Sequence, residues 1–322
     1  MSNIAYRRIL AIINPVSGQQ DPDDTEKILR ERAQEAEVEL EIRRTEGDGD
    51  ALGWAEEAEE QGFDLVLVSG GDGTVVEAIT GLIHSDSTIP LAQLPTGTAS
   101  LIALALGISR NLEKALDLVF DERSKTVHLD VGYLPQQDRY FALIIGAGYD
   151  AHIMEDSPRS LKRRLGFFAY VLVGIKELFS LRRTDITLEL DGEIKKVQAH
   201  TAMVVNIGRI DSANIMLGPD IWHHDGTLDV MVVASTGLRD ILRLTWRVMR
   251  RDFSNYRDLR FYKAHKVRIS AETPLPTQID GDPLGETPLE VEVVPDGVLM
   301  LVPNDYEPKS GDASGSTSGS QR

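Results

Sequence analysis

The residues whose types and spacing are best suited to chemistry are the glycines around a single carboxylate in GGDGT, residues 70–74. Glycine reaches backbone angles closed to other residues and lets another group approach the main chain closely. An apolar run precedes this stretch and a helical pattern follows it, so several backbone N–H groups should point at one spot, which attracts phosphate. The structural alternative is a tight strand-to-helix turn of an α/β fold that binds nothing.

Two better-known phosphate-binding patterns do not fit this stretch. No Gly-Lys-Ser or Gly-Lys-Thr closes it, and Glu77 stands near the place where GxGxxG needs its third glycine. A second stretch, GAGYDA at residues 146–151, does fit GxGxxA. Its flanks do not read as a strand–helix–strand unit, so we favour a glycine turn inside a second domain over a dinucleotide site.

The elements that must position the 70–74 glycines alternate along the first 130 residues. Apolar patterns predict strands over 7–15, 38–45, 63–71 and 89–97, and helices over 23–36, 49–62, 99–108 and from Thr74 onward. This alternation predicts a parallel sheet with helices on both faces. The carboxyl ends of the strands carry NPVSG, TEGDGD, GGDGT and PTGT, and ligands of such sheets bind at that edge.

The pattern changes from about residue 126 to β-rich segments separated by turn residues. Such segments suit a sandwich or a barrel-like second domain. Helical stretches near 160–181 and 238–252 interrupt them, and the tail from residue 307 is a low-complexity sequence that we expect to be disordered.

Composition excludes several classes of function. The 322 residues include no cysteine, which rules out disulfides, thiolate catalysis and zinc–cysteine sites. No stretch reaches the roughly 20 apolar residues of a membrane span, and the apolar run at 9–13 is too short for a signal peptide, so we expect a soluble, cytoplasmic protein. The formal net charge of −17 argues against general nucleic-acid binding.

Two basic segments stand out from this acidic background. Residues 159–183 carry a net charge of +6, and residues 238–268 carry +7. Basic islands of this kind can meet an anionic membrane surface. Solvated helix faces balanced by acidic neighbours are the structural alternative.

Seven motifs, in their order along the chain, resemble the diacylglycerol kinase catalytic-domain family. They are NPVSG at 14–18, GGDGT at 70–74, PTGT at 95–98, GAGYDA at 146–151, KRRLG at 162–166, DGTLD at 225–229 and DGDP at 280–283. The resemblance covers about residues 6–304. It is strongest to soluble bacterial lipid kinases, with sphingosine, ceramide and NAD kinases as relatives.

The resemblance implies a two-domain fold shared with NAD kinases. An α/β domain at 1–128 would carry the nucleotide, and a β-sandwich domain at 129–297 would bind the lipid. A strand at 298–306 would return to the first domain, before a disordered tail at 307–322. The implied reaction transfers the γ-phosphoryl group of ATP to the hydroxyl of a diacylglycerol-like or sphingoid lipid, with Mg²⁺.

Phosphoryl transfer needs positioning and charge stabilisation more than covalent chemistry from the protein. The backbone of 70–74 would donate N–H groups to the phosphates, and Asp72 would hold Mg²⁺ directly or through water. The resemblance implies a full nucleotide site made of Asn14, Thr45, Gly70, Gly71, Asp72, Gly73, Thr74 and Thr98.

In this family the general base is the acid of a DGE turn, which the resemblance places at Asp282. Aspartate is one methylene shorter than glutamate, and a base must reach hydrogen-bonding distance of the attacking hydroxyl. A plain turn is the alternative at this position.

The resemblance also implies a structural Mg²⁺ held by Asp225 and the backbone carbonyls of Trp222 and Thr227. Asp-Gly alone is a hairpin turn, so a turn without metal is again the alternative. The neighbouring His223 and His224 read as surface histidines.

Two departures from the family motifs leave other functions open. Ser100 and Leu101 stand where the family often has the asparagine and aspartate of GTxND. Together with Asp282 they motivate one alternative, a nucleotide- or lipid-binding protein that has lost catalysis. An NAD kinase, which shares GGDGT, is a further alternative, although NPVSG, PTGT and KRRLG point away from it.

The expected partner is a lipid substrate that enters between the domains. Lys162, Arg163 and Arg164 would then lie at the headgroups of an anionic membrane surface, so that a cytoplasmic protein would contact the membrane peripherally. Association into a homodimer is also compatible with the resemblance.

Overall fold

The computed structural model describes residues 6–18, 20–120, 124–148, 183–210, 215–234 and 259–307. The helices among these residues are α1 (Pro22–Glu35), α2 (Asp50–Ala58), α3 (Asp72–His84), α4 (Leu101–Ala105) and α5 (Leu112–Phe120). The strands are β1 (Arg8–Ile13), β2 (Glu39–Arg44), β3 (Leu65–Gly70), β4 (Leu91–Pro95), β5 (Ser124–Leu134), β6 (Arg139–Phe141), β7 (Ile144–Ala147), β8 (Thr184–Leu190), β9 (Glu193–Ala199), β10 (Thr201–Val205), β11 (Arg209–Ile210), β12 (Ile215–Met216), β13 (Leu228–Val233), β14 (Leu259–Ala264), β15 (Lys266–Ala271), β16 (Pro276–Ile279), β17 (Asp282–Glu286) and β18 (Leu289–Pro303).

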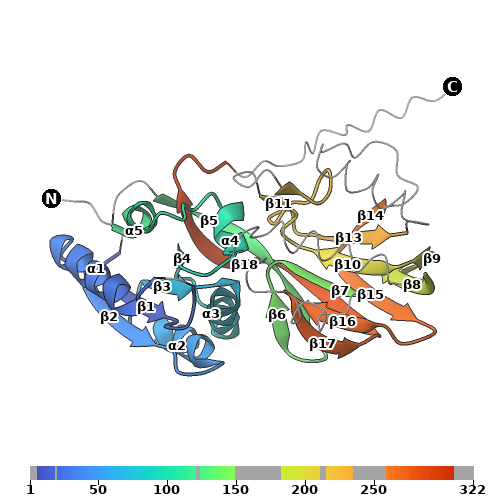
Figure 1. Cartoon of the computed structure of the whole chain (residues 1–322), viewed down its shortest axis with the longest axis horizontal. Coiled ribbons are helices and arrows are strands. Elements are labelled where there is room, and N and C mark those ends of the chain that lie inside the picture. The colour runs from blue at the N-terminus through green and yellow to red at the C-terminus, as the bar shows by residue number, and fades with distance from the viewer. Residues whose placement is uncertain are drawn as a thin grey trace.

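The first part of the chain forms a parallel sheet with the strand order β2-β1-β3-β4. Strands β1 and β3 are buried along nearly their whole length, because helices cover both faces of the sheet. Helices α2 and α3 pack together on one face, and α1 packs with α5 on the other (Figure 1). The predicted parallel α/β domain is therefore confirmed.

Several helices differ from the sequence prediction. The helix expected over 99–108 is the short α4, which ends where Gly107 adopts a φ of +71° and its N–H binds the Leu104 carbonyl. The sequence reading also missed α5, whose buried residues include Leu116 and Phe120. Helix α3, expected from Thr74, begins at Asp72.

Strand β18 joins the two halves of the molecule. Its first part lies between β15 and β5, and its second part lies between β4 and β5. One sheet, of ten strands among the described residues, therefore runs through both halves (Figure 1). The strand expected at 298–306 is the second part of this longer strand. The pairing with β5 shifts at an irregularity between Val294 and Val298 instead of ending there.

A second, antiparallel sheet has the order β14-β13-β10-β7-β16-β17. It packs on strands β8, β15 and β18 of the first sheet through buried residues such as Ile186, Val230 and Val267. The predicted β-sandwich is therefore confirmed. Strand β7 pairs antiparallel on both sides, so the glycines of 146–148 belong to a sandwich strand and its turn, not to a strand–helix–strand unit.

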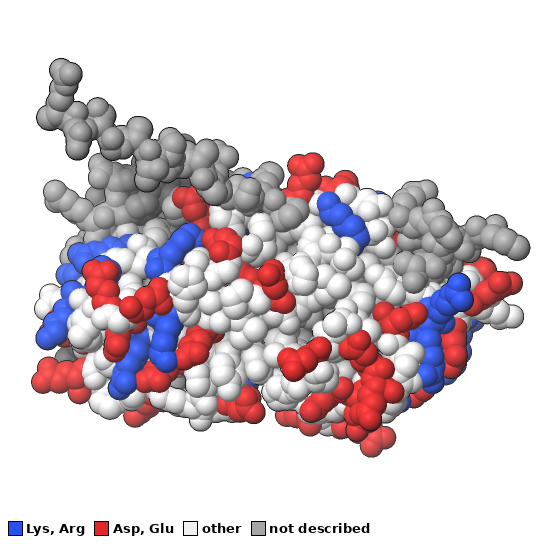
Figure 2. All heavy atoms as spheres, turned by 180° about the vertical axis from the view of Figure 1, so that it is seen from behind, with Lys and Arg blue, Asp and Glu red and all other residues white. Residues whose placement is uncertain are grey.

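The membrane predictions fall largely outside the described residues. These predictions rest on Lys162, Arg163 and Arg164 and on most of the two basic segments. The described part of the second segment includes Lys263, Lys266 and Arg268, and each of these is paired with a carboxylate. Figure 2 shows basic and acidic side chains interspersed on one face of the molecule. Among the described residues no helix is long and apolar enough to cross a membrane.

Candidate active site

Three Gly-rich loops meet at the carboxyl edge of the parallel sheet. The N–H of Gly97 donates to the Gly70 carbonyl over 3.2 Å, and a Cβ on Gly97 would lie only 2.4 Å from the Cα of Gly71. Gly18 adopts a φ of +82°, and a Cβ there would lie 1.6 Å from the Thr96 carbonyl oxygen. The loops at 14–18, 70–74 and 95–98 thus touch through bare backbone, which requires glycine at 18 and 97.

The side chain of Asn14 fastens the end of β1 to the first turn of α3. Its Nδ2 donates to the Thr74 hydroxyl over 2.8 Å, and its Oδ1 accepts from the Val16 N–H over 3.1 Å. A Cβ on Gly73 would meet nothing within 4 Å, so the space in front of this turn is open. The first N–H groups of a helix lack intrahelical acceptors and favour anions, and this arrangement fits a phosphate group.

The carboxylate of Asp72 caps the short helix α4. Oδ2 accepts from the Leu101 N–H over 2.9 Å, and Oδ1 accepts from the Ile102 N–H over 3.0 Å. Ser100, at the N-cap of α4, makes no side-chain cap of its own. Burial raises the pKa of Asp72, while the two amide hydrogen bonds and the charge of Arg110 act in the opposite direction.

Arg110 is a site residue that the sequence reading did not find. One guanidinium nitrogen, Nη2, donates to the carbonyl oxygens of Gly97 and Thr98, in the PTGT loop. Arg110 therefore holds this loop in place and brings a positive charge within electrostatic reach of Asp72. In the sequence Arg110 is one arginine in the connection between two helices, and such a residue gives no specific signal of a site.

The second sheet contributes an acid, Asp280, in the turn between β16 and β17. Its carboxylate accepts from the backbone N–H groups of residues 142, 143 and 144, with the shortest distance, 2.8 Å, to Ile144. Burial raises the pKa of Asp280 to about 7 against these hydrogen bonds, and the negative charge of Asp72 raises it further. The β16–β17 turn thus lies within electrostatic reach of the phosphate loops.

Asp282, the predicted base, is the exposed first residue of β17, opposite Ile279 in the register. It lies two residues beyond Asp280, past Gly281, whose φ is +101°. The sequence reading treated the Asp280–Gly281 pair only as a turn. It had no signal that the Asp280 carboxylate would turn inward to the 142–144 backbone.

Thr98 and Thr45 lie at the same edge of the sheet as Asp72. Thr98 is exposed in the PTGT loop, where its carbonyl accepts from Arg110. Thr45 follows β2, and its N–H donates to the Ile13 carbonyl over 2.9 Å. The structure therefore gathers Asn14, Gly70, Gly71, Gly73, Thr74 and Thr98 around Asp72, with Thr45 one strand further out.

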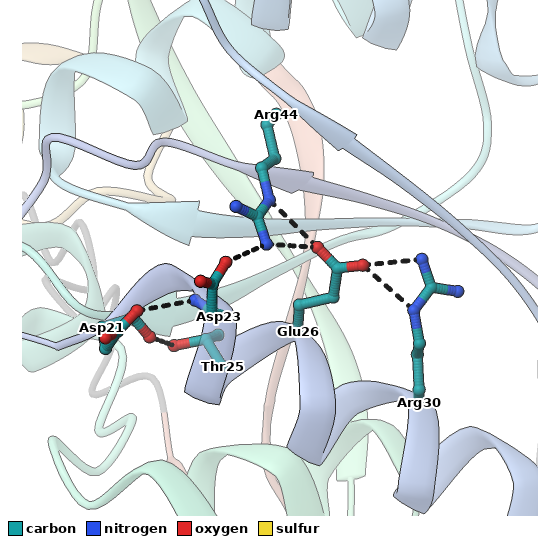
Figure 3. Close-up of polar contacts among 6 residues, drawn as sticks. All are labelled: Asp21, Asp23, Thr25, Glu26, Arg30 and Arg44. Atoms are coloured by element: carbon teal, nitrogen blue, oxygen red, sulfur yellow. Dashed lines mark hydrogen bonds and ion pairs between the residues drawn. The ribbon is translucent and has the colours of Figure 1, made fainter.

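An ion-pair network lies on the outer strand of the sheet, next to Thr45. Arg44 of β2 contacts Asp23 and Glu26 of α1 over 2.7 and 2.6 Å, and Glu26 also binds Arg30 (Figure 3). The Asp21 side chain accepts from the Asp23 N–H and caps α1. An open hollow of about 400 Å³ beside this network is lined by both acidic and basic side chains. We read the network as a clamp between α1 and β2.

The predicted metal ligands lie in the turn before β13. Asp225 Oδ1 accepts from the N–H and hydroxyl of Thr227, and Oδ2 lies 2.7 Å from the Lys263 ammonium. Lys263 also lies 2.9 Å from Asp229. Trp222 packs its ring 5.4 Å from the Arg209 guanidinium. The metal site stays a prediction, but an ammonium group this close to Asp225 does not suit a divalent cation.

Burial and hydrogen bonding together shift the pKa values of Asp229 and Lys263 at this turn. Burial raises the pKa of Asp229 to about 6, against the hydrogen bond from Lys263. Burial also disfavours the charged form of Lys263, but hydrogen bonds to Asp225 and Asp229 hold its pKa above the ordinary value. Within the described ranges no group of three or more His, Cys, Asp or Glu side chains is placed to hold a metal ion.

The expectation that His223 is a surface histidine is wrong. His223 is only 7% exposed, and its Nε2 lies 2.7 Å from the Tyr306 hydroxyl. Its carbonyl accepts from the N–H of Asp130, a buried residue of β5. Burial lowers the pKa of His223 to about 4. The residue therefore links the turn before β13 to the segment after β18.

Comparison with known proteins identifies relatives over nearly the whole chain. A family model described as the diacylglycerol kinase catalytic domain matches residues 8–132. A second, described as a YegS C-terminal NAD kinase beta sandwich-like domain, matches residues 143–302. The first match ends within β5, and the second begins between β6 and β7.

Two curated relatives and one solved structure are similar in sequence and in fold. A diacylglycerol kinase of Bacillus subtilis is 30% identical over 285 residues, covering 88% of this chain and 92% of the relative. A diacylglycerol kinase of Staphylococcus aureus is 27% identical and covers 93% of each chain. A crystal structure of a diacylglycerol kinase from Bacillus anthracis superposes with a TM-score of 0.72 at 25% identity, covering 94% of this chain and 98% of that one.

Proposed function

This chain belongs to the diacylglycerol kinase catalytic-domain family and is a lipid kinase, and from that premise we propose that it transfers the γ-phosphoryl group of ATP to the hydroxyl of a diacylglycerol-like or sphingoid lipid. The observation that carries the proposal is the meeting of the three Gly-rich loops at the carboxyl edge of the parallel sheet, where two backbone amides hold the Asp72 carboxylate. The β16–β17 turn of the sandwich adds Asp280, whose pKa the charge of Asp72 helps to raise. A substrate at this edge would therefore meet groups from both domains.

The phosphate loops suit a nucleoside triphosphate. Gly70, Gly71 and Gly73 present no side chain, and the space before Gly73 is open. Asn14 and Thr74 are already fixed to each other by a hydrogen bond, so their side chains lose little conformational freedom when a phosphate binds. Arg110 would add positive charge at the PTGT loop, on the side of Thr98.

Asp72 is the residue that would hold a Mg²⁺ ion brought with the nucleotide. Each of its oxygens accepts one amide hydrogen bond, which leaves acceptor capacity on both for the ion or for its bound water. When bound, Mg²⁺ supplies charge neutralisation on the phosphate oxygens. The amides of Leu101 and Ile102 keep the Asp72 carboxylate oriented before any ligand arrives.

The exposed Asp282 is our candidate for the general base. In the proposed step the lipid hydroxyl oxygen forms a bond to the γ-phosphorus, and the bond from that phosphorus to the β–γ bridging oxygen breaks. The hydroxyl proton passes to the Asp282 carboxylate. The glycine at 281 and the inward anchor of Asp280 leave Asp282 exposed directly after a well-fixed turn.

A panel of lipid acceptors tests this function. We would measure transfer of labelled γ-phosphate from Mg-ATP to diacylglycerol, monoacylglycerol, ceramide and sphingosine in mixed micelles, with NAD as a separate acceptor. We expect one lipid class to be labelled and NAD to remain unlabelled. ATP binding without any labelled lipid would contradict the proposed reaction and favour a binding protein, and labelled NAD would favour an NAD kinase.

A further inference from the structure

The turn before β13 contains its own positive charge, in a place where the family resemblance implies a bound metal. Lys263 of β14 stands directly opposite Asp229 of β13 in the antiparallel register. Its ammonium lies 2.9 Å from Asp229 Oδ2 and 2.7 Å from Asp225 Oδ2. The Thr227 hydroxyl, at 3.5 Å, lies at the limit of hydrogen-bonding distance.

We propose that the Lys263 ammonium serves as the built-in cation of this turn, so that the turn folds without a resident Mg²⁺. An ammonium has three N–H donors, and here three oxygen atoms surround it. Mg²⁺ at Asp225 would need an oxygen at about 2.1 Å and would stand beside the ammonium. Like charges at that separation repel, so the lysine and the metal exclude each other.

Burial makes the positive charge necessary. The Asp229 side chain is only 5% exposed, and that of Asp225 is 27% exposed. A carboxylate as buried as Asp229, with a second carboxylate beside it, needs a counter-charge. The cross-strand position of Lys263 supplies it from the protein itself, and the buried Asp229 keeps the ammonium from swinging into solvent.

The turn before β13 is also connected by hydrogen bonds to strands β5 and β18, which link the two halves of the chain. The Gly226 N–H donates to Asp130 Oδ2 over 2.7 Å, and the other oxygen of Asp130 accepts from the Asp296 N–H over 2.9 Å. Asp130 lies on β5, and Asp296 lies at the irregularity of β18. Loss of the counter-charge at Asp225 should therefore loosen contacts between the turn and these two strands.

Thermal unfolding of the nucleotide-free protein tests the proposal without requiring turnover. We expect the wild-type Tm to be the same in EDTA and in millimolar Mg²⁺, and metal analysis of the dialysed protein to find no bound divalent ion. Lys263→Met should lower the Tm by several degrees in EDTA, on the order of 5 °C. Mg²⁺ or Ca²⁺ should restore part of that loss, because the vacated oxygens suit a hard cation.

The matched control is Lys266→Met, which removes a lysine paired with one exposed carboxylate, Glu292. We expect it to change the Tm little and to show no response to Mg²⁺. A wild-type Tm that falls in EDTA and recovers with Mg²⁺ would overturn the proposal, as would a Lys263→Met protein that behaves like the control. If Lys263→Met fails to fold, Lys263→Arg should fold and be insensitive to EDTA, and an EDTA-sensitive Lys263→Arg protein would contradict us.

Discussion

The carboxylate of Asp72 accepts a hydrogen bond of 2.9 Å from the backbone N–H of Leu101. Leu101 stands at the position that the family resemblance assigns to an aspartate, and here only its backbone amide contacts Asp72. Asp72 thereby orients the start of α4 and is itself held in front of the open space at Gly73. The same carboxylate has a structural task and, in our proposal, a chemical one.

The structural task of Asp72 predicts a loss of stability. Asp72→Ala removes two amide hydrogen bonds and should lower the free energy of unfolding by about 1–3 kcal/mol. Asp64→Ala is the matched control, since Asp64 also accepts two amide hydrogen bonds, from Arg7 and Arg8, at the opposite edge of the sheet. Urea unfolding should give similar losses for both variants, and an unchanged Asp72→Ala protein would argue against the capping role.

A glycine series separates packing from ligand space. Gly97→Ala should destabilise the protein, because its Cβ would lie 2.4 Å from the Gly71 Cα. Gly73→Ala should fold normally yet lose ATP affinity at least about tenfold, since a methyl group would stand in the open space before α3. Gly53→Ala, with open space at a helical position, is the control for both and should bind ATP normally.

These glycines show how far the sequence determined the site. The four parallel strands and their Gly-rich ends could be predicted, because buried strands are continuous apolar runs and glycine marks close backbone approach. The motifs then placed Asn14, the 70–74 loop and Thr98 on one edge. Local patterns were sufficient wherever a residue acts through its own backbone.

The contacts that could not be predicted are between residues distant in sequence. Asp72 caps a helix 29 residues away, and Asp280 binds an amide 136 residues away. Lys263 lies 38 residues from Asp225 and meets it only because β13 and β14 pair in one register. His223 was expected at the surface because the sequence offers no further ligands for a zinc site there, yet the segment after β18 covers it. No local periodicity encodes such contacts.

The position of Asp282 predicts a kinetic effect without a stability effect. Asp282→Asn should lower kcat about 10²- to 10⁴-fold, as expected for a lost general base, and leave the Tm unchanged because the side chain is exposed. Asp282→Glu should retain activity, since it only extends the reach of the carboxylate. Glu286→Gln, at the exposed far end of the same strand, is the control.

Equal turnover in Asp282→Asn and in the wild type would remove Asp282 from the mechanism. Attention would then pass to Asp280, whose pKa of about 7 would also suit a base near neutral pH. The pH dependence of kcat, measured for Asp282→Asn and for Asp280→Asn, would show which of the two residues acts as the base.

Burial of His223 predicts a contribution to stability that is lost at acidic pH. Its pKa is about 4 in the fold and 6.5 when unperturbed, so between these values the unfolded chain binds a proton that the folded chain refuses. The contribution of His223 to the free energy of unfolding should therefore fall as the pH drops from about 6.5 to 4, by at most about 3 kcal/mol, while the raised pKa values of Asp280 and Asp229 act in the opposite direction. The stability of the wild type relative to His223→Gln should thus fall over this pH range. His128→Gln, at an exposed position of β5, should keep the wild-type pH dependence, and equal slopes in all three proteins would contradict the prediction.

Arg110 should contribute to nucleotide affinity through the PTGT loop. Arg110→Ala frees the Gly97 and Thr98 carbonyls and removes a positive charge near Asp72, so the KM for ATP should rise about tenfold. Lysine would keep the charge but not the planar guanidinium, so the KM for ATP of Arg110→Lys should lie between those of the wild type and Arg110→Ala. Arg30→Ala, in the α1–β2 network of Figure 3, should leave the KM unchanged. A similar rise in both alanine variants would indicate a general electrostatic effect instead.

The most direct test of the central claim is the rate of labelled phosphate transfer from Mg-ATP to diacylglycerol micelles in the Asp72→Ala and Asp64→Ala proteins. Both variants lose a carboxylate that binds two backbone amides, but only Asp72 lies at the phosphate loops. Our account predicts that Asp64→Ala retains nearly wild-type transfer below its Tm and that Asp72→Ala loses it. Equal activity in the two variants would contradict the assignment of this edge of the sheet as the active site.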